Sequence, residues 1–196
     1  MDSLVDRFLR DWTGGRDETA ARVAVFERIR DIPYAIELDL IHSRQYIRIL
    51  ELNRGSCTPK HFLLCAMFQR MGLDTLYACF PFRWDEVELD YPPGLRRLAE
   101  ALPVSYHLAC RVEIEGRMVL VDATLDPQME MLGLPVNGDW DGRSDTTLPV
   151  RPCGDEEIYH PSEAEYIQVR RDAQSLAFYD ELNRWLRESR AAWEAT

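Results

Sequence analysis

The sequence predicts an α+β protein in which helices pack on an antiparallel β-sheet. Helical patterns fill the first third of the chain, and the middle changes to short apolar runs of strand length. Two of these runs flank a two-residue turn, which favours antiparallel pairing. The 196 residues suit one domain, residues 1–196, with its own core. We expect N-terminal helices within 1–52, a core at about 53–126, and a loop with C-terminal helices over 127–196.

Three helical stretches are expected before the core. Apolar side chains recur at helical spacing in Asp2–Trp12 and in Thr19–Arg30, and Leu38–Leu52 is also helix-prone. Gly14-Gly15 ends the first stretch. Ile32-Pro33-Tyr34 breaks the second, because proline disfavours helix in the residue before it.

A buried helix is expected next, over Thr58–Met71. Thr58 suits the N-cap and Pro59 the first helical position. Gly72 is a natural residue just past the C-terminal end. This assignment places Cys57 immediately before the first turn.

The middle of the chain predicts strands. Leu76–Phe82 is a short apolar and aromatic run, typical of a buried strand. Val104–Ile114 and Met118–Ala123, joined by Glu115-Gly116, predict a β-hairpin. Asp90–Leu102, with its Pro-Pro-Gly turn, is expected to contain a short helix.

The last third combines a long loop with helices. Residues 126–161 are rich in proline, glycine and aspartate, and form either a lid over a site or short elements that the pattern hides. Asn137–Asp145 is similar to part of a calcium loop, but Leu148 stands where a bidentate glutamate is required, so a polar turn is favoured. Ser162–Trp193 is expected to be helical, with Ser162 and Glu165 as a capping box.

Composition excludes some functions. The formal charge of −11 argues against nucleic acid as a partner, because an acidic protein repels phosphate backbones. The N-terminal sequence lacks the basic start and apolar core of a signal peptide, and no apolar stretch has the length of a membrane span. Five cysteines without a CxxC pair are then expected to be free thiols in a reducing cytoplasm.

Cys57 is the candidate nucleophile. A thiolate at a helix N-terminus is stabilised by the unpaired N–H groups and the helix dipole, which lower its pKa. The same N–H groups can stabilise the oxyanion of an acyl-transfer intermediate. A small buried cysteine that only packs is the alternative interpretation of this residue.

The hairpin brings a candidate base and acid together. With Glu115-Gly116 as the turn, Ala109 faces Asp122, and His107 lies diagonally from Asp122 on the same face. An acid in that place can fix the imidazole tautomer while the other ring nitrogen faces the thiol. A one-residue change in the turn would put the two side chains on opposite faces. Taken alone, His107 could also be a strand histidine with an ordinary hydrogen bond.

The complete pattern resembles the transglutaminase-like superfamily, whose Cys-His-Asp core is papain-like. The matching stretches are RGSCTPKHFLLCAMFQRMGL and YHLACRVEIEGRMVLVDATLD, with IRDIPY upstream. The resemblance implies a transglutaminase-like, cysteine-proteinase-like fold, with Cys57 as nucleophile, His107 as general base and Asp122 as its orienting acid. The chain departs from the family in having Thr58 where an aromatic residue often follows the cysteine. Arylamine N-acetyltransferases share the Cys-His-Asp order, but their glycine-rich, glutamate-containing surround is missing.

The resemblance implies a thiol-dependent acyl-transfer enzyme that acts on peptide or protein amides through a thioester on Cys57. Hydrolysis, as in a peptidase, and transglutaminase-type transfer differ only in the second nucleophile. The alternative is a catalytically inactive interaction module on the same fold. No cofactor and no metal are expected, and the oligomeric state is left open.

Other residues are weaker candidates. Gln45 and Tyr46 are oxyanion donors by position only. Cys57 and Cys65 stand too far apart along a helix to bind one metal ion with His61, which is expected to cap or pack near the site. Trp84 and Trp140 either line a substrate cleft or cover the core. The apolar stripe of residues 176–186 is expected to be core, with partner binding as the alternative.

Overall fold

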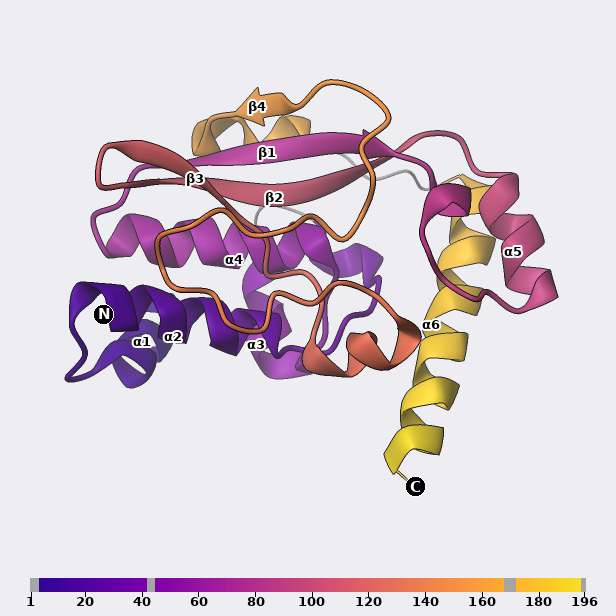
Figure 1. Ribbon diagram of the computed structural model, residues 1–196, viewed down its shortest axis with the longest axis horizontal. Helices are drawn as coiled ribbons and strands as arrows, with labels where there is room; N and C mark the ends of the chain where they lie inside the picture. The colour runs from indigo at the N-terminus through magenta and orange to yellow at the C-terminus, as the bar shows by residue number, and fades with distance from the viewer. Residues whose placement is uncertain (1–3, 42–44, 168–171, 195–196) are drawn as a thin grey trace.

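The computed structural model describes residues 4–41, 45–167 and 172–194. A four-stranded antiparallel sheet has the order β3-β2-β1-β4. Its strands are β1 (Thr75–Phe82), β2 (Ser105–Ile114), β3 (Arg117–Val121) and β4 (Glu157–Tyr159). Helices pack on this sheet (Figure 1), so the predicted α+β class with an antiparallel sheet is confirmed.

The main hydrophobic core lies between the sheet and three helices. Helix α4 (Cys57–Arg70) packs on β1 and β2, and α1 (Leu4–Thr13) and α2 (Glu18–Arg30) pack on α4 from the other side, as Figure 1 shows. Eleven residues of α4 are buried, which is why its sequence is apolar almost all round. Both N-terminal helices are confirmed, and the first two residues of the predicted Asp2–Trp12 helix lie outside the described residues.

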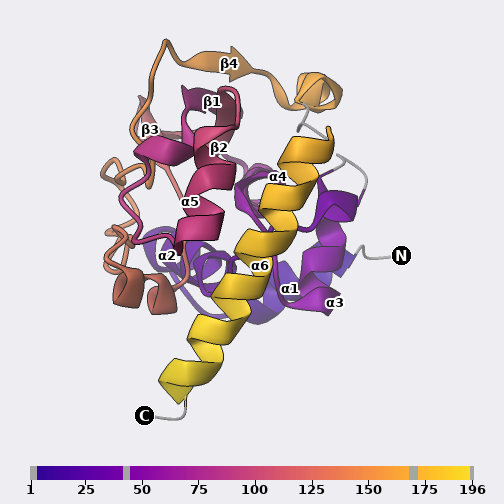
Figure 2. The ribbon, with the colours of Figure 1, turned by 90° about the vertical axis from the view of Figure 1, so that its right-hand side faces the viewer.

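A second hydrophobic cluster occupies one end of the molecule. It joins α5 (Pro93–Glu100), the 3₁₀ turns η3 (Trp84–Glu86) and η4 (Pro127–Leu132), and α6 (Ala173–Glu194). Figure 2 shows α6 running across this end. The predicted core stripe is confirmed for Phe178, Tyr179, Leu182 and Leu186, which are buried, whereas Leu176 is exposed. None of the described helices is both long and apolar enough to cross a membrane.

The predicted helix over Leu38–Leu52 is wrong in its described part. The chain forms η1 (Leu38–Leu40), η2 (Tyr46–Arg48) and the single turn α3 (Ile49–Leu52) instead, with residues 42–44 outside the described residues. The neighbours Leu40 and Ile41 are both buried, but the first belongs to the main core and the second to the second cluster. The segment contributes side chains to both hydrophobic clusters. One apolar face of a continuous helix would pack against a single cluster only.

Helix α4 begins one residue earlier than the sequence predicts. Ser56 is the N-cap, with an extended backbone, and its carbonyl accepts the N–H of Lys60 at 3.3 Å. Cys57 is therefore the first residue inside the helix, and Thr58 is not the cap. Pro59 is tolerated in the first turn, where its missing N–H leaves no bond unmade. The predicted C-terminal end is confirmed, with Gly72 at a φ of 83° just past it.

The hairpin has the predicted register. Ile114 pairs with Arg117 and Cys110 with Val121, and the ladder ends there. Glu115 and Gly116 have φ values of 54° and 79°, the two positive angles of a type I′ turn. This turn sets which residues of β2 and β3 lie opposite one another.

Residues 126–161 form short elements held against the body of the protein, namely η4 and β4 with long connections. Arg22 and Arg30 are buried, and their guanidinium groups donate to the carbonyls of Gly142, Asn137 and Gly138. The calcium-like stretch is a local turn, since the Asp141 carboxylate accepts from the N–H groups of residues 143 and 144. Of the two expectations for this segment, the short elements are confirmed.

The predicted capping box is misplaced by two residues. The 3₁₀ turn η5 (Pro161–Tyr166) has His160 as N-cap, whose backbone N–H donates to Glu163 at 2.7 Å. Ser162 therefore lies inside the turn rather than at its start. Pro161 explains the shift, because proline fits the first position of a helical turn.

Candidate active site

Cys57 stands half-buried at the N-terminus of α4. The Ser56 side chain makes no cap hydrogen bond, and Pro59 has no N–H. The first turn therefore leaves the backbone N–H groups of Cys57 and Thr58 without an intrahelical acceptor. These two donors and the helix dipole favour negative charge at the helix end where Cys57 lies.

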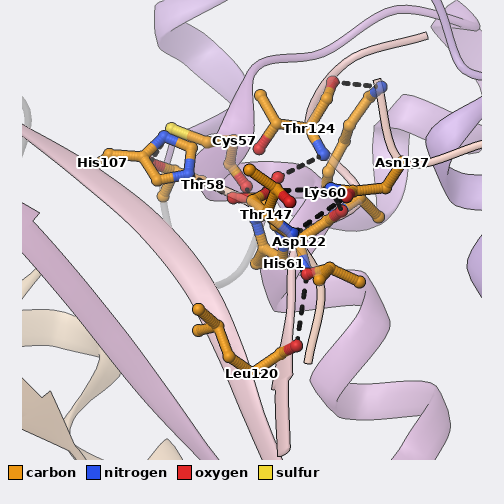
Figure 3. Close-up of polar contacts among 12 residues, drawn as sticks. Cys57, Thr58, Lys60, His61, His107, Leu120, Asp122, Thr124, Asn137 and Thr147 are labelled. Atoms are coloured by element: carbon orange, nitrogen blue, oxygen red, sulfur yellow. Dashed lines mark hydrogen bonds and ion pairs between the residues drawn. The ribbon is translucent and has the colours of Figure 1, made fainter. Parts of the chain in front are cut away.

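His107 and Asp122 form a buried pair at the base of the hairpin. The imidazole Nε2 lies 2.5 Å from Oδ2 of Asp122, and both residues are almost completely buried. The remaining ring nitrogen, Nδ1, is left for the thiol. Figure 3 shows the sulfur of Cys57 beside the His107 ring, and each of the two groups shifts the pKa of the other. The structure thus brings together all three predicted site residues.

The charges of the three groups support one another. Burial raises the pKa of the Cys57 thiol, but the hydrogen bond and charge of His107, with the Leu108 N–H, lower it below its ordinary value. Burial opposes the charge on His107, yet Asp122 and Cys57 raise the pKa of that imidazole to about 10. The pKa of Asp122 is lowered in turn, since His107 outweighs burial. The arrangement favours a thiolate beside an imidazolium.

Asp122 is fixed by its own backbone surroundings. Its Oδ1 accepts the N–H of Thr124 at 2.9 Å, and its N–H donates to the hydroxyl of Thr146 at 2.7 Å. Asn137 donates to its carbonyl at 3.0 Å. The loop after residue 126 therefore holds the backbone of Asp122 in place, a role that the sequence did not reveal.

His61 connects Cys57 to the residue that follows Asp122. One turn into α4, its Nδ1 lies 2.8 Å from the carbonyl of Cys57, and its Nε2 accepts the N–H of Ala123 at 3.0 Å. A ring that accepts at Nε2 carries its proton on Nδ1 and is neutral. Burial lowers the pKa of His61 to about 4, although Asp122 opposes the change. The expectation that His61 packs near the site is confirmed, with a more specific geometry.

Lys60 is a second buried polar residue beneath the site. Its ammonium group is completely buried and donates to the carbonyls of Arg30 at 3.0 Å and Thr124 at 2.7 Å. Burial lowers its pKa to about 7, against the raising influence of Asp126 and Asp122. Lys60 links the end of α2 to the segment after β3. The sequence gave no signal of this role, because Lys60 stands there only as one lysine in an apolar helical stretch.

A cavity of about 90 Å³ opens beside Cys57 and His107. Tyr34 is the polar wall residue that sequence reasoning missed, although it ends the quoted IRDIPY segment. Its backbone N–H donates to Asp126 at 2.7 Å, and Tyr34 forms a β-bridge with Gly55, two residues before Cys57. Burial and then the charge of Cys57 raise the pKa of the Tyr34 phenol well above its ordinary value, so it stays protonated and able to donate.

Several weaker candidates lie elsewhere. Tyr46 packs its ring on Phe62, and neither it nor Gln45 lines the cavity. Trp84 lines the cavity, whereas Trp140 packs on Phe26 with ring centres 5.0 Å apart, so for Trp140 the core-covering alternative is confirmed.

Cys65, the third residue of the Cys57–His61–Cys65 stripe, lies apart from the candidate site. The sulfur of Cys65 lies in the core, 3.0 Å from that of Cys110. Across the described parts of the chain, no cluster of three or more ligand-type side chains could hold a metal ion. Cys65 thus belongs to the packing of α4 on the sheet and not to the site.

No protein-family model matches the chain, and no curated protein matches it either.

Proposed function

We propose that Cys57, His107 and Asp122 are the catalytic triad of a thiol-dependent acyl-transfer enzyme that acts on amide bonds. In this proposal the chain has a transglutaminase-like core, as its RGSC and hairpin motifs indicate. The observation that carries the proposal is the arrangement of Cys57, His107 and Asp122. The thiol lies at a helix N-terminus, and the acid lies 2.5 Å from the imidazole.

The chemistry follows from the geometry. The Cys57 thiolate attacks the amide carbonyl carbon, and the carbonyl oxygen becomes an oxyanion that the N–H groups of the first turn can stabilise. The C–N bond then breaks as His107 gives its proton to the leaving amine, and the acyl group stays on sulfur as a thioester. A water molecule or a second amine attacks the thioester, His107 takes its proton, and the thiolate is released.

The identity of the second nucleophile separates two activities. Water makes the protein a hydrolase or peptidase, and an amine makes it a transferase of the transglutaminase type. A peptide or protein amide is the proposed substrate class for either one. The first half-reaction, formation of the thioester on Cys57, is common to both and is the step to test.

The test is the pH dependence of alkylation at Cys57. Cys153 is an exposed free thiol and Cys57 is half-buried, whereas the other three cysteines are buried. The Cys153→Ser variant therefore leaves Cys57 as the accessible thiol for iodoacetamide. We expect the rate at pH 6 to stay within a few-fold of the rate at pH 8, whereas a thiol with a pKa of about 8.5 would slow about 100-fold.

Two further variants serve as controls in that background. Cys57→Ala should abolish labelling, and His107→Gln should restore the steep pH dependence of an ordinary thiol. Labelling that survives Cys57→Ala would contradict the assignment of the nucleophile. An ordinary pH profile at Cys57, with no thioester detected by intact mass after incubation with amides, would favour the inactive interaction module.

A further inference from the structure

The wall of the cavity beside Cys57 is mostly apolar, with hydroxyl groups of tyrosine, serine and threonine residues among its lining. It reaches from the nucleophile into the second hydrophobic cluster, where Met129, Leu182 and Leu186 are almost completely buried. Among the described residues that line it, His107 is the one with an ionisable base, and no lysine, arginine, aspartate or glutamate is present. A charged group placed in this space beyond the reach of His107 would lose its hydration without gaining a partner.

The shape of the cavity is set by elements distant in the sequence. Three parts of the chain supply much of the wall: residues 36–41, the end of β1 with η3, and α6. Helix α6 is fastened there, because Asn183 exchanges two hydrogen bonds of 2.9 Å with the backbone of Ile36. These hydrogen bonds hold the α6 side of the wall in a fixed position.

Two buried polar atoms along this wall have no hydrogen-bond partner within the described residues. They are the hydroxyl of Thr124, two residues after the triad aspartate, and the indole N–H of Trp84. An unpaired buried group costs free energy, so a ligand that carries a polar atom beside an apolar body would relieve it.

We infer that this cavity binds the acyl group of the substrate, and that this acyl group is apolar, uncharged and of medium length. The inference rests on the proposed function, since it names the substrate class of the same site. A peptide backbone would bring several polar groups into a mostly apolar space, whereas an alkanoyl chain brings one carbonyl. The inference therefore replaces the peptide or protein amide of the proposed function with an alkanoyl amide. At about 10–15 Å³ for each water-sized space, a cavity of about 90 Å³ has room for a chain of several methylene groups.

The experiment measures acylation of Cys57 by intact mass with a series of 4-nitroanilides. The acyl groups are acetyl, butanoyl, hexanoyl, octanoyl and the charged succinyl. Each buried methylene should raise the acylation rate up to about fourfold. We expect hexanoyl to react at least tenfold faster than acetyl, and succinyl to react more slowly than butanoyl.

A matched pair of variants locates the effect. Val150 is half-buried and lines the cavity, whereas the half-buried Val136 packs on the same cluster outside it. Val150→Trp should shift the fastest acylation to shorter acyl chains. Val136→Trp should leave the order of acylation rates as it is in the wild type. Equal rates for acetyl, hexanoyl and succinyl, or the same change in both variants, would overturn the inference.

A binding measurement separates this inference from the proposed function. Hexanamide should raise the melting temperature of Cys57→Ala, and Val150→Trp in the same background should reduce that rise. Binding without any acylation of the wild type would refute the enzyme while supporting the apolar site. Acylation that ignores chain length, with no binding of hexanamide, would support the enzyme and refute the site.

Discussion

His61 holds the first turn of α4 and the end of β3 together through its two ring nitrogens. Its pKa of about 4 in the folded protein lies below the ordinary value of about 6.5. Between those values the unfolded chain binds a proton at this residue and the folded protein does not. Stability therefore falls as the pH drops through this window, by about 3 kcal/mol in total.

The His61→Gln variant has no group that titrates at this position. We expect the free energy of unfolding of the variant to change less between pH 6.5 and pH 4 than that of the wild type, by about 3 kcal/mol. Urea unfolding at a series of pH values measures the difference. His107 cannot produce the effect, because its raised pKa removes stability only as the pH rises toward about 10. Parallel curves for the two proteins would contradict the assignment.

Tyr34 is the candidate side-chain donor to the oxyanion. Its phenol stays protonated in the cavity next to Cys57. Tyr34→Phe should lower the rate of acylation by hexanoyl 4-nitroanilide about 100-fold, the usual effect of removing one such donor. Alkylation by iodoacetamide forms no oxyanion, so its rate should not change. A loss of both rates together would instead indicate a disturbed thiol.

The β2–β3 turn is the element on which the relation of His107 to Asp122 depends. Both side chains share a face only because Ile114 pairs with Arg117 across a two-residue turn. A shift of one residue would move one of them to the opposite face. Gly116, at a φ of 79°, adopts the backbone conformation that the turn requires.

Gly116→Val should therefore destabilise the protein by about 1–2 kcal/mol, because a branched side chain is strained at positive φ. Gly94, in the first turn of α5, has open space around it and serves as the control. Gly94→Ala should leave stability unchanged or raise it by less than about 1 kcal/mol. Thermal unfolding of both variants measures this, and equal effects would argue against a role for the turn geometry.

At the scale of the whole molecule, α6 completes the site from the far end of the chain. Arg190 makes two contacts of 2.7–2.8 Å with the carboxylate of Asp126, four residues after Asp122. Asp126 also accepts the N–H of Tyr34. One buried carboxylate thus joins the C-terminal helix, the cavity wall and the segment after β3 that carries Asp122.

Arg190→Met should cost about 3–5 kcal/mol of stability, because it leaves Asp126 buried without its cation. Arg184, on the same helix, pairs with Glu181 and Glu188 on the exposed surface. Arg184→Met should cost less than about 1 kcal/mol. Urea unfolding distinguishes them, and comparable losses in both would show that the Arg190–Asp126 pair is not a structural link.

The residue pattern predicted the α+β class, helix α4 and the hairpin register, and together with the family resemblance it predicted the three candidate site residues. The class, the helix and the register depend on interactions between near neighbours in the sequence, such as helical spacing, a two-residue turn and strand alternation. Tertiary structure decided what surrounds them: the division of Leu40 and Ile41 between two cores, the burial of Lys60, the place of Tyr34 and the apolar cavity. Those features arise where segments distant in the sequence meet, 30–92 residues apart at Lys60 and Tyr34, and local propensity carries no information about which distant side chains will share one space.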